Sequence, residues 1–159
     1  GFFAEPEEPD DYPGVILIHE WWGLNDDIKD AARELASEGY SVLTVDLYEG
    51  KVATTSADAQ KYRDSIDKTR TIENLKAALA HLKEQGADKV ASLGWGFGGG
   101  KSLELSLAGV DLDGTPATIL KQLTVSFPKG TFMTKKSQFT YVASSSHLVS
   151  FGARRAEPL

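Results

Sequence analysis

A glycine-rich turn, Gly94-Trp95-Gly96-Phe97-Gly98-Gly99, is the segment whose residue types and spacing point most clearly to chemistry. It lies between a predicted strand over residues 88–94 and a predicted helix over residues 101–108. A strand-to-helix turn of the form G-x-nucleophile-x-G presents its central residue for attack on a carbonyl carbon. The next backbone N–H, here that of Phe97, donates to the oxyanion formed during acyl transfer. The central residue here is Gly96, which has no side chain that could attack.

A second segment with chemical potential is His19-Glu20-Trp21-Trp22, at the end of an apolar run that starts at Gly14. From residue types alone, Glu20 is a solvated carboxylate at a strand end, and His19 is a histidine with its hydrogen bonds satisfied. Trp21, Trp22 and Trp95 have two readings, because they either line an apolar pocket or pack in the core.

The elements that must position these segments alternate between strands and helices, which indicates an α/β fold with a parallel sheet and helices on both faces. Buried apolar runs predict the strands, and apolar residues at spacings of three to four predict the helices. The expected strands are 14–19, 40–46 and 88–94, with a further strand start at 1–4 and weak candidates at 117–127 and 138–143; the expected helices are 26–38, a stretch from Ser56, 71–85 and 101–108.

Several motifs together resemble the dienelactone hydrolase (carboxymethylenebutenolidase) family of the α/β-hydrolase superfamily. They occur in the family's order over residues 1–113, as His19-Glu20-Trp21-Trp22-Gly23-Leu24-Asn25, Gly39-Tyr40, Val45-Asp46-Leu47-Tyr48 and Gly94-Trp95-x-Phe97-Gly98-Gly99. At the position x the family normally has cysteine and sometimes serine. The resemblance implies an α/β-hydrolase-type fold, incomplete at the C-terminus here, related to enzymes that open cyclic or activated esters with a Cys/Ser-His-Asp triad.

The resemblance also implies roles for individual residues. Glu20 matches the family's glutamate, which interacts with the resting nucleophile, and the Trp21 N–H would be a second oxyanion donor beside that of Phe97. Trp22 and Trp95 would line the substrate pocket. Arg63 is the nearest candidate for an arginine that binds a substrate carboxylate in some members, and its alternative reading is a solvated helix residue.

Three departures from the family pattern affect the chemistry. Gly96 leaves the nucleophile position vacant, and residues 114–159 contain no aspartate for the triad. His147 is the one late histidine and lacks the surroundings typical of the family's histidine loop. We therefore expect an inactive or weakly active relative of these hydrolases. The alternative is a non-catalytic module that binds a small ester, lactone or carboxylate through the retained apolar pocket and oxyanion donors.

A third reading concerns Gly98-Gly99-Gly100-Lys101-Ser102, which resembles the end of a phosphate-binding loop, G-x-x-x-x-G-K-[ST]. That motif needs a glycine at position 95, where Trp95 stands. Nucleotide binding is therefore the least favoured alternative. The sequence predicts no cofactor and no metal site.

Composition limits the other function classes. A chain of 159 residues is long enough for one domain with a real core, and a net charge of −6 argues against nucleic-acid binding. No apolar run is long enough to span a membrane, no signal segment opens the chain, and the absence of cysteine excludes disulfides and thiolate metal sites. We expect a cytoplasmic protein.

Charge divides the chain near residue 113. Six of the 17 basic residues but only one of the 23 acidic residues, Glu157, lie in 114–159. We expect residues 1–113 to form the dienelactone-hydrolase-like domain, and 114–159 to be a divergent basic segment of that domain or a disordered or foreign tail. If the final strands are missing, the sheet edge is exposed and favours a homodimer.

Overall fold

The computed structural model describes residues 1–8, 12–113, 115–118 and 142–143, and the statements below concern those residues. The strands are β1 (Phe2–Ala4), β2 (Gly14–Ile18), β3 (Ser41–Val45), β4 (Val90–Trp95), β5 (Thr115–Thr118) and β6 (Val142–Ala143). The helices are α1 (Asp26–Ser37), α2 (Ser56–Asp64), α3 (Lys68–Glu84) and α4 (Phe97–Leu107).

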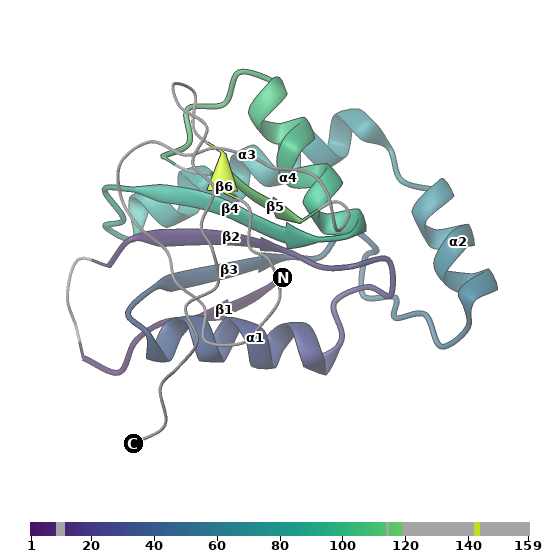
Figure 1. The fold of residues 1–159 in the computed structure, drawn as a ribbon, viewed down its shortest axis with the longest axis horizontal. Helices are drawn as coiled ribbons and strands as arrows, with labels where there is room; N and C mark the ends of the chain where they lie inside the picture. The colour runs from purple at the N-terminus through teal and green to yellow at the C-terminus, as the bar shows by residue number, and fades with distance from the viewer. Residues whose placement is uncertain (9–11, 114, 119–141, 144–159) are drawn as a thin grey trace.

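The strands form one sheet in the order β1-β3-β2-β4-β5-β6. The inner strands β3, β2, β4 and β5 run parallel, whereas the outer strands β1 and β6 pair antiparallel to their neighbours. Helix α1 covers one face, and α3 and α4 cover the other (Figure 1). The predicted α/β fold with helices on both faces is confirmed. The antiparallel outer strands were not foreseen, since such short strands carry too little pattern.

Strand β2 is the centre of the core, and all five of its residues are buried. Because successive strand side chains point to opposite faces, Ile16 and Ile18 pack in a cluster with α3 and α4, while Val15 and Leu17 pack in a cluster with α1. This two-sided burial explains the continuous apolar run, which is typical of a central parallel strand.

Three of the helices begin with a side-chain cap. The Asn25 carboxamide oxygen accepts the Ile28 N–H at 3.2 Å at the start of α1, and Thr55 and Asp67 cap α2 and α3 in the same way. Helix α4 differs because Gly96 stands at its N-cap and supplies no side-chain hydrogen bond. The first amides of α4 are therefore available to another acceptor.

The predicted start of α4 at Lys101 is wrong by four residues, since the helix begins at Phe97. A run of three glycines is a poor helix former, at a cost of about 1 kcal/mol per glycine relative to alanine. Tertiary packing overrides that preference here, because the first turn of α4 lies directly against β2. Of the three, Gly98 is needed for this close approach.

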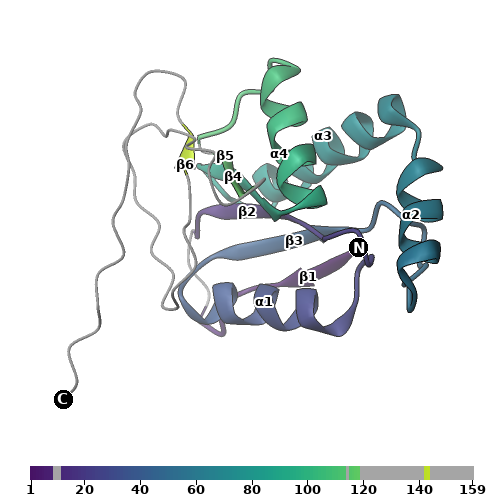
Figure 2. The same ribbon diagram turned by 45° about the vertical axis from the view of Figure 1, so that its right-hand side comes forward.

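Helix α2 lies apart from the layered part of the fold, beyond the end of the sheet (Figure 2). None of the helices in the described ranges is both long and apolar enough to cross a bilayer. Two expectations stay predictions: the homodimer through a sheet edge and the division of the chain at residue 113. Most of 114–159 lies outside the described residues.

Candidate active site

Two glycines shape the turn between β4 and α4. A Cβ on Gly94 would lie 2.6 Å from the carbonyl oxygen of Gly98, and a Cβ on Gly98 would lie 2.6 Å from the carbonyl oxygen of His19 and closer still to that of Ile18. Real side chains do not tolerate such distances to backbone atoms. The G-x-x-x-G spacing therefore reflects a physical requirement, since it lets α4 start against the end of β2.

Gly96, between them, has φ of +51° and ψ of −114°. This conformation is sparsely populated by residues with a side chain, and such strain is found mainly where function requires it. The turn therefore joins β4 to α4 with its central residue in a conformation that the predicted nucleophile elbow would require. Gly96 is exposed, so this position faces solvent.

The Glu20 carboxylate is the nearest group to the missing side chain. A Cβ built on Gly96 would lie 3.1 Å from Oε1 of Glu20, and no other heavy atom of the described residues beyond the turn itself comes within 4 Å. Register explains the approach, because β2 and β4 are parallel and Ile18 pairs with Gly94. Glu20 and Gly96 each follow their paired residue by two positions. The structure brings these two predicted site residues together.

Two backbone amides beside Glu20 and Gly96, those of Trp21 and Phe97, have no hydrogen-bond partner among the described residues. Trp21 lies in a turn closed by a hydrogen bond of 3.1 Å from the Gly23 N–H to the Glu20 carbonyl, and Phe97 is the first residue of α4. No hydrogen bond from either amide occurs within the described part of the chain. The N-terminus of α4 adds a partial positive charge. Unpartnered N–H groups at such a terminus suit a carbonyl oxygen or an oxyanion.

His19 is fully buried beside this site, and both of its ring nitrogens are engaged. Nδ1 lies 2.6 Å from the Glu20 carbonyl, and Nε2 accepts the Leu47 N–H at 3.0 Å. Burial lowers the pKa of His19 below its ordinary value, although the Glu20 hydrogen bond and the Asp46 charge raise it in part. The imidazole is thus neutral and structural, which supports the satisfied-histidine reading.

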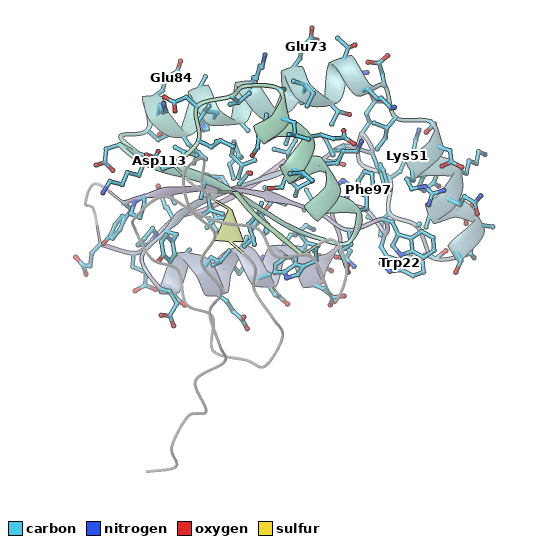
Figure 3. The ribbon with its side chains drawn as sticks, turned by 45° about the horizontal axis from the view of Figure 1, so that its top comes forward. Trp22, Lys51, Glu73, Glu84, Phe97 and Asp113 are labelled. Carbon is cyan, nitrogen blue, oxygen red and sulfur yellow. The ribbon has the colours of Figure 1, made fainter. Side chains whose placement is uncertain are left out.

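The aromatic candidates occupy different places. Trp21 and Trp22 are half-buried in edge-to-face contact, with ring centroids 5.0 Å apart. Trp22, Phe97 and Lys51 lie at the same end of the sheet, opposite Asp113 (Figure 3). Trp95 instead packs against the core cluster on the α1 face. The core reading is thus favoured for Trp95, whereas Trp22 remains a candidate pocket residue.

The remaining candidates do not join the elbow in the described structure. Arg63 is exposed on α2 and pairs with the neighbouring Asp64 at 2.8 Å. His147 lies outside the described residues. Lys101, from the phosphate-loop reading, binds the Glu104 carboxylate at 2.8 Å, and Ser102 is buried with its Oγ 2.7 Å from that of Ser92. Both phosphate-loop side chains are therefore engaged within the fold.

Sequence reasoning missed Tyr48, which packs against His19 and Phe97 with ring centroids at 4.7 and 5.8 Å, while those two rings also contact each other. Its buried hydroxyl has no hydrogen-bond partner in the described part of the protein, and burial raises its pKa to about 12. A cavity of about 280 Å³ adjoins Tyr48, between α2 and α3, but neither Glu20 nor Gly96 lines it. The aromatic residue in Val45-Asp46-Leu47-Tyr48 was the available signal.

Together, the sheet order and the glycine-rich turn between β4 and α4 are those of an α/β-hydrolase-type domain. The model of the dienelactone hydrolase family matches residues 1–118. The chain therefore belongs to the dienelactone hydrolase family.

Individual relatives agree with this assignment. A putative carboxymethylenebutenolidase of Saccharolobus solfataricus is 32% identical over 153 aligned residues, covering 72% of this chain and 58% of the relative. Protein usf of Aquifex pyrophilus is 36% identical over 118 residues, covering 69% and 49%. Among solved structures, the dienelactone hydrolase-like promiscuous phosphotriesterase P91 from metagenomic libraries is 34% identical with a TM-score of 0.57, covering 69% and 48%. The chain spans about half the length of the relatives it matches.

Proposed function

We propose that this chain forms a dienelactone-hydrolase-like site that binds a small ester or lactone but forms no acyl-enzyme at residue 96. The observation that carries the proposal is the elbow conformation of Gly96, whose missing side chain would point at Glu20. The position for a covalent nucleophile is kept, and the nucleophile is not. Residue 96 of this chain therefore cannot attack a carbonyl carbon.

The retained groups support binding of a carbonyl compound. The free N–H groups of Trp21 and Phe97 are suited to a carbonyl oxygen, and the half-buried rings of Trp21 and Trp22 offer an apolar surface. An ionised Glu20 would repel an anion at this place. A neutral ester or lactone therefore fits the site better than a free carboxylate does.

A titration with dihydrocoumarin, a cyclic ester, tests the binding proposal by following the backbone amide resonances in the NMR spectrum. We expect the Trp21 and Phe97 amide signals to move in a saturable way, while those of Gly39 and Gly109, which follow the C-terminal ends of α1 and α4, stay in place. Trp22→Ala should weaken binding several-fold, and Leu107→Ala, on the exposed surface of α4, should not. Shifts confined to other parts of the molecule would overturn the proposal.

A further inference from the structure

We propose that Glu20 acts as a general base on a water molecule that takes the place of the missing nucleophile. The chain would then hydrolyse activated esters and lactones slowly by direct attack of water, without a covalent intermediate. This inference rests on the proposed ester or lactone binding at the same site, and it adds an activity that the vacant position alone does not suggest.

The geometry at Gly96 carries the inference. A Cβ built on Gly96 would lie 3.1 Å from Oε1 of Glu20, and among the described residues outside the turn no other heavy atom lies within 4 Å of it. A water cannot occupy the Cβ position, because Cα would be too close. It can sit to one side of that position, in contact with Cα, and donate a hydrogen bond to the carboxylate. Hydrogen-bond reach to the proton is the first requirement for a general base.

The reaction balances without another reagent. The water oxygen forms a bond to the carbonyl carbon while one water proton passes to Oε1 of Glu20. The carbonyl electron pair moves onto its oxygen, where the Trp21 and Phe97 amides would donate to it. When that pair returns, the bond to the leaving oxygen breaks, and an alkoxide takes the proton from Glu20. The products are an acid and an alcohol, or one hydroxy acid from a lactone.

Three other ionisable side chains near residue 96, those of His19, Lys101 and Asp46, are already engaged. His19 uses both ring nitrogens in hydrogen bonds, so it cannot accept a proton without breaking one. Lys101 is bound to Glu104, and Asp46 accepts the Tyr48 and Gly50 amides. In the described part of the chain, Glu20 is therefore the carboxylate both near Gly96 and free of a recorded side-chain partner.

The first test compares Glu20→Gln with Glu34→Gln, which removes an exposed carboxylate from α1 away from the elbow. Steady-state hydrolysis of p-nitrophenyl acetate should fall at least roughly tenfold in Glu20→Gln, since general bases typically contribute about 10²–10⁴-fold. Glu34→Gln should match the wild type. Equal rates in all three proteins, or no wild-type rate above the heat-treated protein, would overturn the inference.

Gly96→Ala tests the water position itself. Its methyl group would fill the space beside Oε1 of Glu20, so the rate should fall as in Glu20→Gln, and a wild-type rate would overturn the inference. Because φ is positive at residue 96, circular dichroism must show that this variant is folded. If Gly96→Ala does not fold, the comparison of Glu20→Gln with Glu34→Gln still tests the inference.

Isotope labelling separates general-base catalysis from attack by Glu20 itself. In H₂¹⁸O, the inference predicts one labelled oxygen in the acid product and none in the Glu20 peptide after repeated turnovers. Label in that peptide would mean that Glu20 formed an anhydride, which overturns the general-base role. The dihydrocoumarin titration keeps the two proposals distinct. If Glu20→Gln binds dihydrocoumarin normally and hydrolyses p-nitrophenyl acetate at the wild-type rate, the general-base role is wrong and the binding proposal stands.

Discussion

Glu20 at the end of β2 and Gly96 at the start of α4 meet across two paired strands, with 3.1 Å between Oε1 of Glu20 and the Cβ position of Gly96. The parallel β2–β4 register, which pairs Ile18 with Gly94, produces this approach. The carboxylate is thus placed to contact whatever occupies the elbow. In this chain the elbow carries no side chain.

Restoring a thiol by Gly96→Cys should bring back little esterase turnover. Triad members act as a unit, and no aspartate follows residue 113 in this sequence. The measurement is kcat/KM for p-nitrophenyl acetate. Because the chain has no other cysteine, iodoacetamide labelling can confirm that the new thiol is accessible. Recovery by several orders of magnitude would show that the chain does supply a base for the new thiol.

The elbow glycines should differ sharply in their tolerance of alanine. Gly98→Ala forces a Cβ into the backbone of β2, and we expect it to lower the free energy of unfolding by about 3 kcal/mol or more. Gly100→Ala is the matched control, since a Cβ there meets nothing within 4 Å. Alanine should stabilise that helical position by up to about 1 kcal/mol. Urea unfolding of both variants tests this contrast, and similar effects would contradict the close packing of α4 on β2.

His19 should make stability depend on pH. Burial lowers its pKa in the folded state below the ordinary 6.5, so the unfolded chain takes up a proton first as pH falls. The His19 contribution is therefore complete above pH 6.5 and is lost between 6.5 and the folded-state pKa, with a slope of at most about 1.4 kcal/mol per pH unit.

Urea unfolding from pH 8 to pH 5 measures this slope. His19→Gln should remove it, whereas His81→Asn, at an exposed position on α3, should keep it. An unchanged slope in His19→Gln would show that other groups cause the acid destabilisation.

Removing the Tyr48 hydroxyl should cost little. Among the described residues this buried group has no partner, so Tyr48→Phe forfeits no hydrogen bond and should change the free energy of unfolding by less than about 1 kcal/mol, or stabilise the protein. Thr71→Val is the contrast, because the Thr71 Oγ1 donates to the Asp67 carbonyl at 2.8 Å and its loss should destabilise by about 1 kcal/mol. A larger loss in Tyr48→Phe would reveal a partner for this hydroxyl.

Much of the fold could be predicted because its elements carry strong local patterns. The apolar run that begins at Gly14 predicts the central strand, and the helix expected over 26–38 is α1 (Asp26–Ser37). The family was predictable from motifs with physical roles, such as Gly94 and Gly98, where a Cβ would collide with backbone atoms. The start of α4 was not, because helix propensity is a weak prior and packing against β2 decides the conformation of Gly98.

The site was less predictable than the fold. The residue types at positions 20 and 96 pointed to the elbow, but the direction from Gly96 to Glu20 depends on strand register and on a positive φ. The orphaned Tyr48 hydroxyl depends on three-dimensional packing, which local patterns do not encode. Sequence could therefore name the parts of the site without placing their atoms.

Rapid mixing of the protein with excess p-nitrophenyl acetate tests the central claim most directly, that this site forms no acyl-enzyme. A covalent intermediate releases p-nitrophenol in a burst equal to the protein concentration, followed by slower turnover. Without a nucleophile at residue 96, we predict release that is linear from the first measured point. A stoichiometric burst would contradict the account.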